Sequence, residues 1–452
     1  MDTIIDVNEI SLETVKSLRG KLDRREIGAR ELCAAYIEQI NELNPDLNAL
    51  ISIFTEEALA TADEAQKLID DGRAETLTGI PCALSDNIMT AGKVTSCASK
   101  MLENFIPPYD AAVTETLINA HSPLLGKTDL NEFSVGGTFK SGTAVCSGFV
   151  PFSLGSDTGG ALRLAAAYNE LTGLRPTYGR VSRYGMAAHA SSLDQIGPLA
   201  KTAEDCAIVL NSIAKKDPRD LATFESNEDF TEKIGESIKG LKIALPKQFF
   251  DTDNGNISDE VKTAVMLAAK ELEKQGAVLK EISTEMANYA APVYFIIAGA
   301  EASSNFSRYD GITFGLRGEG KTFFEQITDS RNRGFGDRIK RRILLGNFVL
   351  SSENYKDYYE KALALRQKIK AEYNEIFKEA DVVLTPTLPK INPHKYLLSF
   401  CTAPPALAGL PSITTTCGCT PLGIPMGMLL TGNRFNEKTI IQVADRYENL
   451  TR

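Results

Sequence analysis

Histidine, clustered basic residues and long apolar runs are all scarce in this chain of 452 residues, and each shortage excludes a class of function. No stretch approaches the ~20 consecutive apolar residues that a membrane-spanning helix needs. A net charge of −10, with lysine and arginine dispersed, argues against direct binding of a nucleic-acid backbone. The acidic residues 1–6 have neither the basic nor the apolar part of a secretory signal. We therefore expect a soluble, cytoplasmic protein with no direct contact to a membrane or to nucleic acid.

The cysteines and histidines do not form recognisable sites. The eight cysteines lack the paired spacing of a disulfide framework, and we expect reduced thiols. Cys417-Gly-Cys419 has the form of half a metal site, but no histidine lies near it in the sequence. His121, His189 and His394 are too widely spaced to indicate a Ser-His-Asp triad, and we interpret His189 as structural. The sequence therefore predicts no metal site and no cofactor.

Hydrophobic periodicity distinguishes an N-terminal helical part from a later part rich in strands. Leu12, Leu18 and Leu22 fall on one helical face, and further helical patterns follow. Between residues 77 and about 198, short apolar runs alternate with glycine-rich turns, which is typical of buried strands. Residues 241–279 have the pattern of a strand-helix-strand unit. This alternation predicts an α/β fold with a mixed β-sheet.

We predict a single large domain over residues 1–452, with a β-sheet core flanked by helices on both faces. It comprises a helical lead-in over 1–75, a core at about 77–210 and the remainder of the same domain over 211–452. No internal repeat, low-complexity tract or long linker interrupts the sequence.

A glycine-rich loop at residues 155–161 is the first candidate for a functional site. It follows an apolar strand and opens a helix-like run, so its backbone N–H groups can converge on an anion or a carbonyl oxygen. Thr158, Gly159 and Gly160 are therefore candidate oxyanion or ligand-binding residues. A tight structural turn before a helix explains the loop alone equally well.

Several motifs in a fixed order resemble the amidase signature family. They are Gly79-Ile80-Pro81, Asp86-Asn87, and residues 125–128, 131–133, 155–160, 173–182 and 192–198. Residues 300–305, 308–311, 334–336, 340–346 and 407–411 are similar, more narrowly, to the A subunits of tRNA-dependent amidotransferases, which hydrolyse glutamine. The resemblance covers essentially the whole chain.

That resemblance implies a catalytic triad whose residues are absent from this chain. In the family a lysine base acts through a bridging serine on a nucleophilic serine. The corresponding positions here are Ser85, Gly137 and Ala161. A serine cannot replace a neutral lysine as the base, and the methyl group of Ala161 cannot attack a carbonyl carbon. No intact triad is therefore expected.

The resemblance also implies a clamp for the substrate. In the A subunits an arginine holds the carboxylate of glutamine, while an aspartate holds its amine. The arginine corresponds to Arg341 or Arg342, whereas the aspartate position is Ser399. Its loss removes a charge-assisted hydrogen bond to the ammonium group of the substrate.

These changes lead us to predict a non-catalytic pseudoenzyme that has lost amide hydrolysis and serves in assembly, regulation or ligand sensing within a protein complex. The alternative is a working glutaminase and amidotransferase A subunit, which supports glutamine-dependent amidation of Glu-tRNA(Gln), or a diverged amidase with a relocated nucleophile at Ser156, Thr158 or Ser85. The family likeness implies GatB-like and GatC-like proteins as partners. A small carboxylate or amide is the expected ligand.

Overall fold

A mixed β-sheet runs through the computed structural model, which describes residues 10–136, 139–253, 256–285, 287–391, 393 and 397–451. Eleven strands of this described part form the sheet, in the order β1 (Leu50–Ile53), β3 (Leu124–Thr128), β2 (Cys82–Ser85), β4 (Phe152–Asp157), β6 (Gln195–Ala200), β5 (Thr172–Arg175), β10 (Ser412–Cys419), β11 (Pro425–Gly432), β9 (Val382–Pro386), β7 (Lys242–Pro246) and β8 (Val278–Ile282). Parallel pairs join β2 to β3 and β4, and β7 to β8 and β9; the other neighbours are antiparallel. The predicted α/β fold class is confirmed.

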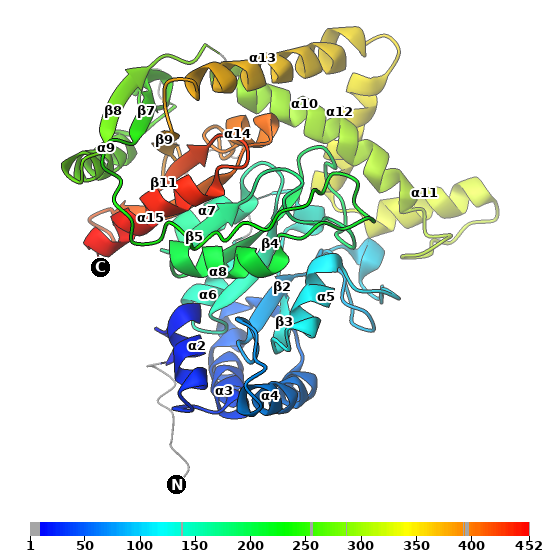
Figure 1. Cartoon of the computed structure of the whole chain (residues 1–452). Helices are drawn as coiled ribbons and strands as arrows, with labels where there is room; N and C mark the ends of the chain where they lie inside the picture. The colour runs from blue at the N-terminus through cyan, green and yellow to red at the C-terminus, as the bar shows by residue number, and fades with distance from the viewer. Residues whose placement is uncertain are drawn as a thin grey trace.

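Helices lie on both faces of the sheet (Figure 1). Helices α8 (Ala203–Ile213), α9 (Asp259–Lys274) and α15 (Glu437–Thr451) pack on one face, and α6 (Lys140–Cys146) and α7 (Ala161–Tyr168) pack on the other. Side chains alternate between these faces along a strand. In β5 the hydroxyl of Thr172 donates to Glu448 of α15, whereas the next residue, Gly173, faces Leu162 and Ala166 of α7.

The other α-helices extend the two ends of the sheet. They are α2 (Val15–Asp23), α3 (Ala29–Leu47), α4 (Thr55–Asp70), α5 (Ala112–Asn119), α10 (Ala287–Asn305), α11 (Phe323–Gly334), α12 (Asp337–Leu350), α13 (Lys361–Ile376) and α14 (Ala403–Ala408). Figure 1 shows α2, α3 and α4 together at the N-terminal end and α10 to α13 at the opposite end. No described helix combines the length and the apolarity needed to cross a membrane.

Local sequence explains where the first helix begins. The hydroxyl of Thr14 accepts a hydrogen bond from the Ser17 N–H at 3.1 Å and caps α2. Leu18 and Leu22 are buried, as their spacing predicts, but Leu12 is 78% exposed because it precedes the cap. The apolar face was therefore predicted correctly only within the helix. The domain boundaries that we drew from the sequence stay predictions.

A buried ion cluster ties the centre of the sheet to α7. Asp157, at the end of β4, accepts hydrogen bonds from Arg163 of α7 at 2.8 and 2.9 Å, and Arg175 of β5 lies 3.4 Å from the same carboxylate. All three side chains are fully buried. Burial favours the neutral carboxyl, but the two guanidinium groups outweigh it and hold the pKa of Asp157 below its usual value. The charge of Asp157 is therefore required to neutralise buried arginine.

Replacing Asp157 with alanine is expected to destabilise the protein by about 3–5 kcal/mol, because it leaves two buried guanidinium groups without their anion. Denaturant unfolding followed by circular dichroism measures the effect. The matched control is Asp357→Ala, which removes an exposed ion pair with Lys361 and is expected to leave the unfolding midpoint nearly unchanged. Equal midpoints for the two variants would show that the cluster does not stabilise the fold.

Candidate functional site

The glycine-rich loop between β4 and α7 is held by close contacts on both sides. Gly160 has a φ of +131°, and a Cβ atom there would lie 2.2 Å from the hydroxyl oxygen of Thr402. A Cβ atom at Gly159 would lie 2.4 Å from the ring of Tyr294. The Thr402 hydroxyl donates to the Gly159 carbonyl at 2.6 Å. Only glycine fits these two positions, and the tight packing fixes the loop at the start of α7.

The loop presents backbone donors that the rest of the described chain does not use. No described residue accepts a hydrogen bond from the N–H of Gly159 or Gly160. These groups lie at the N-terminal end of α7, where the helix dipole also favours negative charge. This is the donor arrangement that stabilises an oxyanion.

Thr158 forms a hydroxyl–carboxyl pair with Asp194. Its hydroxyl donates to one carboxyl oxygen of Asp194 at 2.6 Å, and the other oxygen accepts from the backbone N–H of His189 and Ala190 at 2.8 and 2.9 Å. Burial raises the pKa of Asp194 to about 7, although these hydrogen bonds oppose the rise. Asp194 therefore titrates near neutral pH and can accept or return a proton there.

A cavity of about 540 Å³ adjoins this loop. Thr158, Gly159 and Ala161 line one part of it. Further lining residues are Arg338, Arg341 and Arg342 of α12, Tyr294 and Phe295 of α10, and Leu398 and Ser399. Spacings of three and four residues bring the arginines to one side of the helix. None of the described lining residues is acidic, so the cavity favours an anionic ligand.

The structure brings most of the predicted site residues to this cavity. Thr158, Gly159, Ala161, Arg341, Arg342 and Ser399 all line it. Gly160 shapes the loop from behind and is not in the lining. Gly137 lies outside the described residues. The roles assigned to these residues stay predictions, although their proximity is what those roles require.

Sequence reasoning missed several lining residues, and three of them bear on the chemistry of the cavity. Arg338 carries a usable signal, since it stands three and four residues before the two predicted arginines. Tyr294 has no such signal, because only tertiary packing places its ring against Gly159. His189, which we interpreted as structural, also lines the cavity. Burial and the nearby Arg342 lower its pKa to about 3, so its imidazole is neutral near pH 7.

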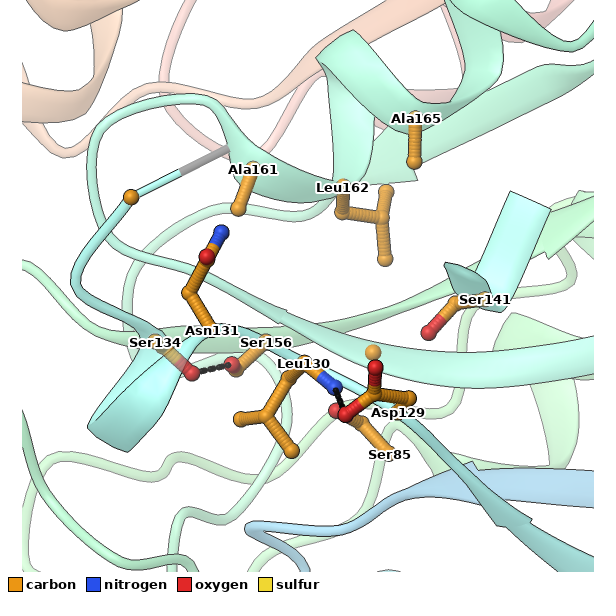
Figure 2. A pocket seen from close by; sticks show the side chains of 12 residues that line it. Ser85, Asp129, Leu130, Asn131, Ser134, Ser141, Ser156, Ala161, Leu162 and Ala165 are labelled. Carbon is orange, nitrogen blue, oxygen red and sulfur yellow. Dashed lines mark hydrogen bonds between the residues drawn. The ribbon is translucent and has the colours of Figure 1, made fainter. Parts of the chain in front are cut away.

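A second, smaller cavity of about 30 Å³ lies beside the first, and the two share Ser134, Gly136 and Ala161. Figure 2 shows the residues that line the smaller cavity. Ser85, at the end of β2, lines only this smaller cavity. The Asn87 amide donates to the hydroxyls of Ser156 and Ser134 at 2.8 and 3.2 Å, and these two hydroxyls lie 3.3 Å apart. In addition to Asn131, five polar side chains line this small cavity: those of Ser85, Asp129, Ser134, Ser141 and Ser156.

Lys127 does not replace the missing lysine. It is fully buried in β3, and burial lowers its pKa to about 8. Its ammonium group donates to the carbonyl of Ile88, and the residue lines neither cavity. A lysine with a lowered pKa is thus present in the core, but it does not line the site.

Comparison with known proteins agrees with this architecture. The family model described as Amidase matches residues 31–141 and 134–441. The chain belongs to the amidase family. The A subunit of the glutamyl-tRNA(Gln) amidotransferase of Ruminiclostridium cellulolyticum is 41% identical, over 97% of both chains. The protein of the same name from Caldanaerobacter subterraneus subsp. tengcongensis is 42% identical, over 96% of both.

Solved structures of this family share the fold. The crystal structure of the glutamyl-tRNA(Gln) amidotransferase A subunit from Thermotoga maritima superposes with a TM-score of 0.73 at 32% identity, covering 97% of this chain and 93% of that one. The peptide amidase of Stenotrophomonas maltophilia gives a TM-score of 0.82 at 25% identity, covering 98% and 97%. The predicted resemblance to the amidase signature family, and within it to these A subunits, is confirmed.

The interpretation of the chain as a non-catalytic pseudoenzyme is wrong. Its likeness to amidotransferase A subunits extends at about 40% identity over nearly the whole chain, which supports the alternative of a working A subunit. That prediction rested on the losses at Ser85, Gly137 and Ala161, and it ranked a relocated nucleophile at Ser156, Thr158 or Ser85 only as an alternative. The folded chain places another hydroxyl, that of Thr158, in the same cavity with a titratable partner. Loss of side chains at aligned positions therefore does not establish loss of chemistry.

The raised pKa of Asp194 gives a stability prediction. Its contribution to the free energy of unfolding is fully present below the unfolded pKa of about 4 and is lost as pH rises to about 7. The loss amounts to roughly 4 kcal/mol. Asp194→Asn is expected to flatten the fall in stability between pH 4 and 7, whatever its effect on absolute stability. Denaturant unfolding across this pH range measures the slope. Asp357→Asn, at an exposed site, should retain the wild-type slope; an unchanged slope in Asp194→Asn would contradict the prediction.

Proposed function

We propose that this chain is the A subunit of a glutamyl-tRNA(Gln) amidotransferase, which hydrolyses the side-chain amide of glutamine and supplies ammonia for amidation of the glutamate carried by the tRNA. The observation that carries the proposal is the full-length identity of about 40% to A subunits, together with a cavity in which arginines face the glycine-rich loop. GatB-like and GatC-like proteins are the partners we propose. The nucleic acid is bound by a partner, since this chain carries a net charge of −10.

The cavity residues suggest how glutamine is held. We assign its carboxylate to Arg341 and Arg342, whose guanidinium groups suit a planar anion. Its amide carbonyl oxygen then reaches the N–H group of Gly159, which lines the cavity at the start of α7. The side chain of glutamine separates these two ends of the ligand, and the arginines and Gly159 both line the cavity that would hold it.

Thr158 is the proposed nucleophile, in place of the residue at position 161. Its oxygen attacks the amide carbon while its proton passes to Asp194, 2.6 Å away. The C–N bond then breaks, the nitrogen takes that proton and ammonia leaves. Asp194 takes a proton from water, whose oxygen attacks the Thr158 ester. The ester C–O bond then breaks, Asp194 returns the proton to the Thr158 oxygen, and glutamate leaves. A carboxyl whose pKa is raised to about 7 suits both proton transfers near neutral pH.

The proposal is tested by reconstituting the chain with the B and C subunits of its own organism and Glu-tRNA(Gln). We expect Gln-tRNA(Gln) to form with glutamine as the nitrogen donor. If the product forms with ammonium chloride but not with glutamine, the glutaminase step is refuted. If the product forms with neither donor, the whole proposal is refuted.

Thr158 variants test the nucleophile in the same complex. Thr158→Val removes the hydroxyl but keeps the shape of the side chain. We expect it to lower the rate of glutamine-dependent amidation at least ~100-fold, because loss of the nucleophile closes the covalent route. Thr158→Ser keeps a hydroxyl and should retain measurable activity. Ammonium-dependent amidation by Thr158→Val should be unchanged and serves as the folding control. Full glutamine-dependent activity of Thr158→Val would exclude this residue as the nucleophile.

Ser399→Asp tests the substrate clamp. No acidic residue among the described lining of the cavity opposes the ammonium group of glutamine, so a carboxylate at this position should add a charge-assisted hydrogen bond. We expect KM for glutamine to fall roughly 10-fold or more, with little change in kcat. Conversely, Arg341→Ala with Arg342→Ala should raise KM, whereas Arg333→Ala, on the surface of α11, should not. An unchanged KM in Ser399→Asp would place the amine elsewhere.

A further inference from the structure

The smaller cavity has room for a small ion or a water molecule. Its volume of about 30 Å³ exceeds the ~10–15 Å³ that one water molecule requires and is far below the 540 Å³ of the larger cavity. It lies where β2, β4 and α6 approach the start of α7. Ammonium and potassium ions are of similar size to water, so the space admits them without displacement of the walls.

The polar part of the wall of this cavity offers oxygen atoms, and the guanidinium group of Arg338 donates to Asn131 of that wall at 3.5 Å. One carboxylate, Asp129, and the hydroxyls of Ser85, Ser134, Ser141 and Ser156 face it, and no lysine or arginine is among its described lining residues. Figure 2 shows Ser85 and Asp129 at one end and the hydrogen-bonded pair Ser134 and Ser156 on an adjacent side. The surface is therefore one that stabilises a cation able to donate several hydrogen bonds.

Two of these groups have unused hydrogen-bonding capacity. The Ser85 side chain is only 5% exposed, and its hydroxyl has no hydrogen-bond partner among the described residues. Asp129 accepts a single hydrogen bond, 2.8 Å from the N–H of Leu130, and makes no ion pair in the described chain. Lys140 acts on Asp129 only through space, since its ammonium group donates to the carbonyl of Leu47. A buried hydroxyl without a partner and a partly buried carboxylate with a single hydrogen bond are costly unless a ligand satisfies them.

We propose that this cavity is a binding site for a single ammonium ion, held by the Asp129 carboxylate and the hydroxyl oxygens of Ser85 and Ser141. The four N–H groups of ammonium point to the corners of a tetrahedron and match a carboxylate with hydroxyl acceptors. Magnesium does not suit the site, because it needs near-octahedral oxygen ligands at short distances and usually keeps several waters. Burial raises the pKa of Asp129, and a cation beside it would reverse that effect.

The site explains what becomes of the ammonia released in the reaction proposed above, and its physiological role rests on that function. The two cavities share Ser134, Gly136 and Ala161, so ammonia formed at Thr158 needs to cross only this common wall, and it becomes ammonium by taking a proton from water. By the family resemblance, the lysine base of the triad, which acts as a neutral amine, belongs at position 85. Here a serine stands at that position, and the space beside it admits a free ammonium ion.

Thermal unfolding of the purified chain tests the site without tRNA or partners. At equal ionic strength, ammonium chloride is expected to raise Tm by roughly 1–3 °C over sodium chloride, with saturation. Potassium chloride distinguishes the two ions of similar size. An equal shift with potassium would show a general monovalent-cation site, and no difference from sodium would show water only; either result overturns the proposal.

Two variants and a control locate the effect. Asp129→Asn should abolish the ammonium-dependent shift, whereas Asp357→Asn, at an exposed site, should keep it. Ser85→Lys places a covalently attached ammonium group at the cavity and should make Tm indifferent to ammonium chloride while the protein stays folded. A full ammonium shift in Ser85→Lys would place the ion elsewhere. Because the measurement involves no amide hydrolysis, failed amidation with a positive shift refutes only the proposed function, and the reverse result refutes only the ammonium site.

Discussion

The carboxylate of Asp157, enclosed by Arg163 and Arg175, is the interaction on which the site depends. Through Arg163 it fixes α7 and, by a hydrogen bond of 2.8 Å, the carbonyl of Thr402. Arg175 in turn donates to the carbonyl of Leu193 at 2.6 Å, next to Asp194. Three distant parts of the chain thus converge on one buried negative charge. Neither arginine can move without leaving a buried charge unpaired. The pairing of Asp157 with these arginines therefore fixes where the glycine-rich loop lies relative to Thr158 and Asp194.

Sequence reasoning succeeded where local pattern determines structure. The burial of Leu18 and Leu22, the strand before the glycine-rich loop and the arginines of α12 all follow from spacing of three and four residues or from motifs. It failed where tertiary contacts decide. The imidazole of His189 reaches the cavity only because its loop folds over Asp194, and no local signal in the sequence indicates that approach. The exposure of Leu12 depends on the cap at Thr14, which a face drawn from periodicity alone ignores.

The error about catalysis has the same origin. Alignment to a motif identifies which side chains have changed, but it does not identify which others share the space they left. Around Ala161 the fold gathers Thr158 in one cavity, Ser85 in the other and Ser134 in both. Ser85 and Ala161 are smaller than the lysine and serine that the family resemblance implies at these positions, and both line the small polar cavity beside the ligand-sized one.

The contact between Gly160 and Thr402 has a consequence for how this protein can evolve. These residues are far apart in sequence, yet a Cβ atom at 160 would lie 2.2 Å from the threonine hydroxyl, and that hydroxyl also holds the Gly159 carbonyl. A mutation at either position therefore changes the selective value of mutations at the other. Thr402 also lies close in sequence to Ser399, which lines the cavity. Changes in the loop and changes in the neighbouring cavity wall are therefore coupled through this contact. A homologue that alters one side of the contact is expected to carry a compensating change on the other.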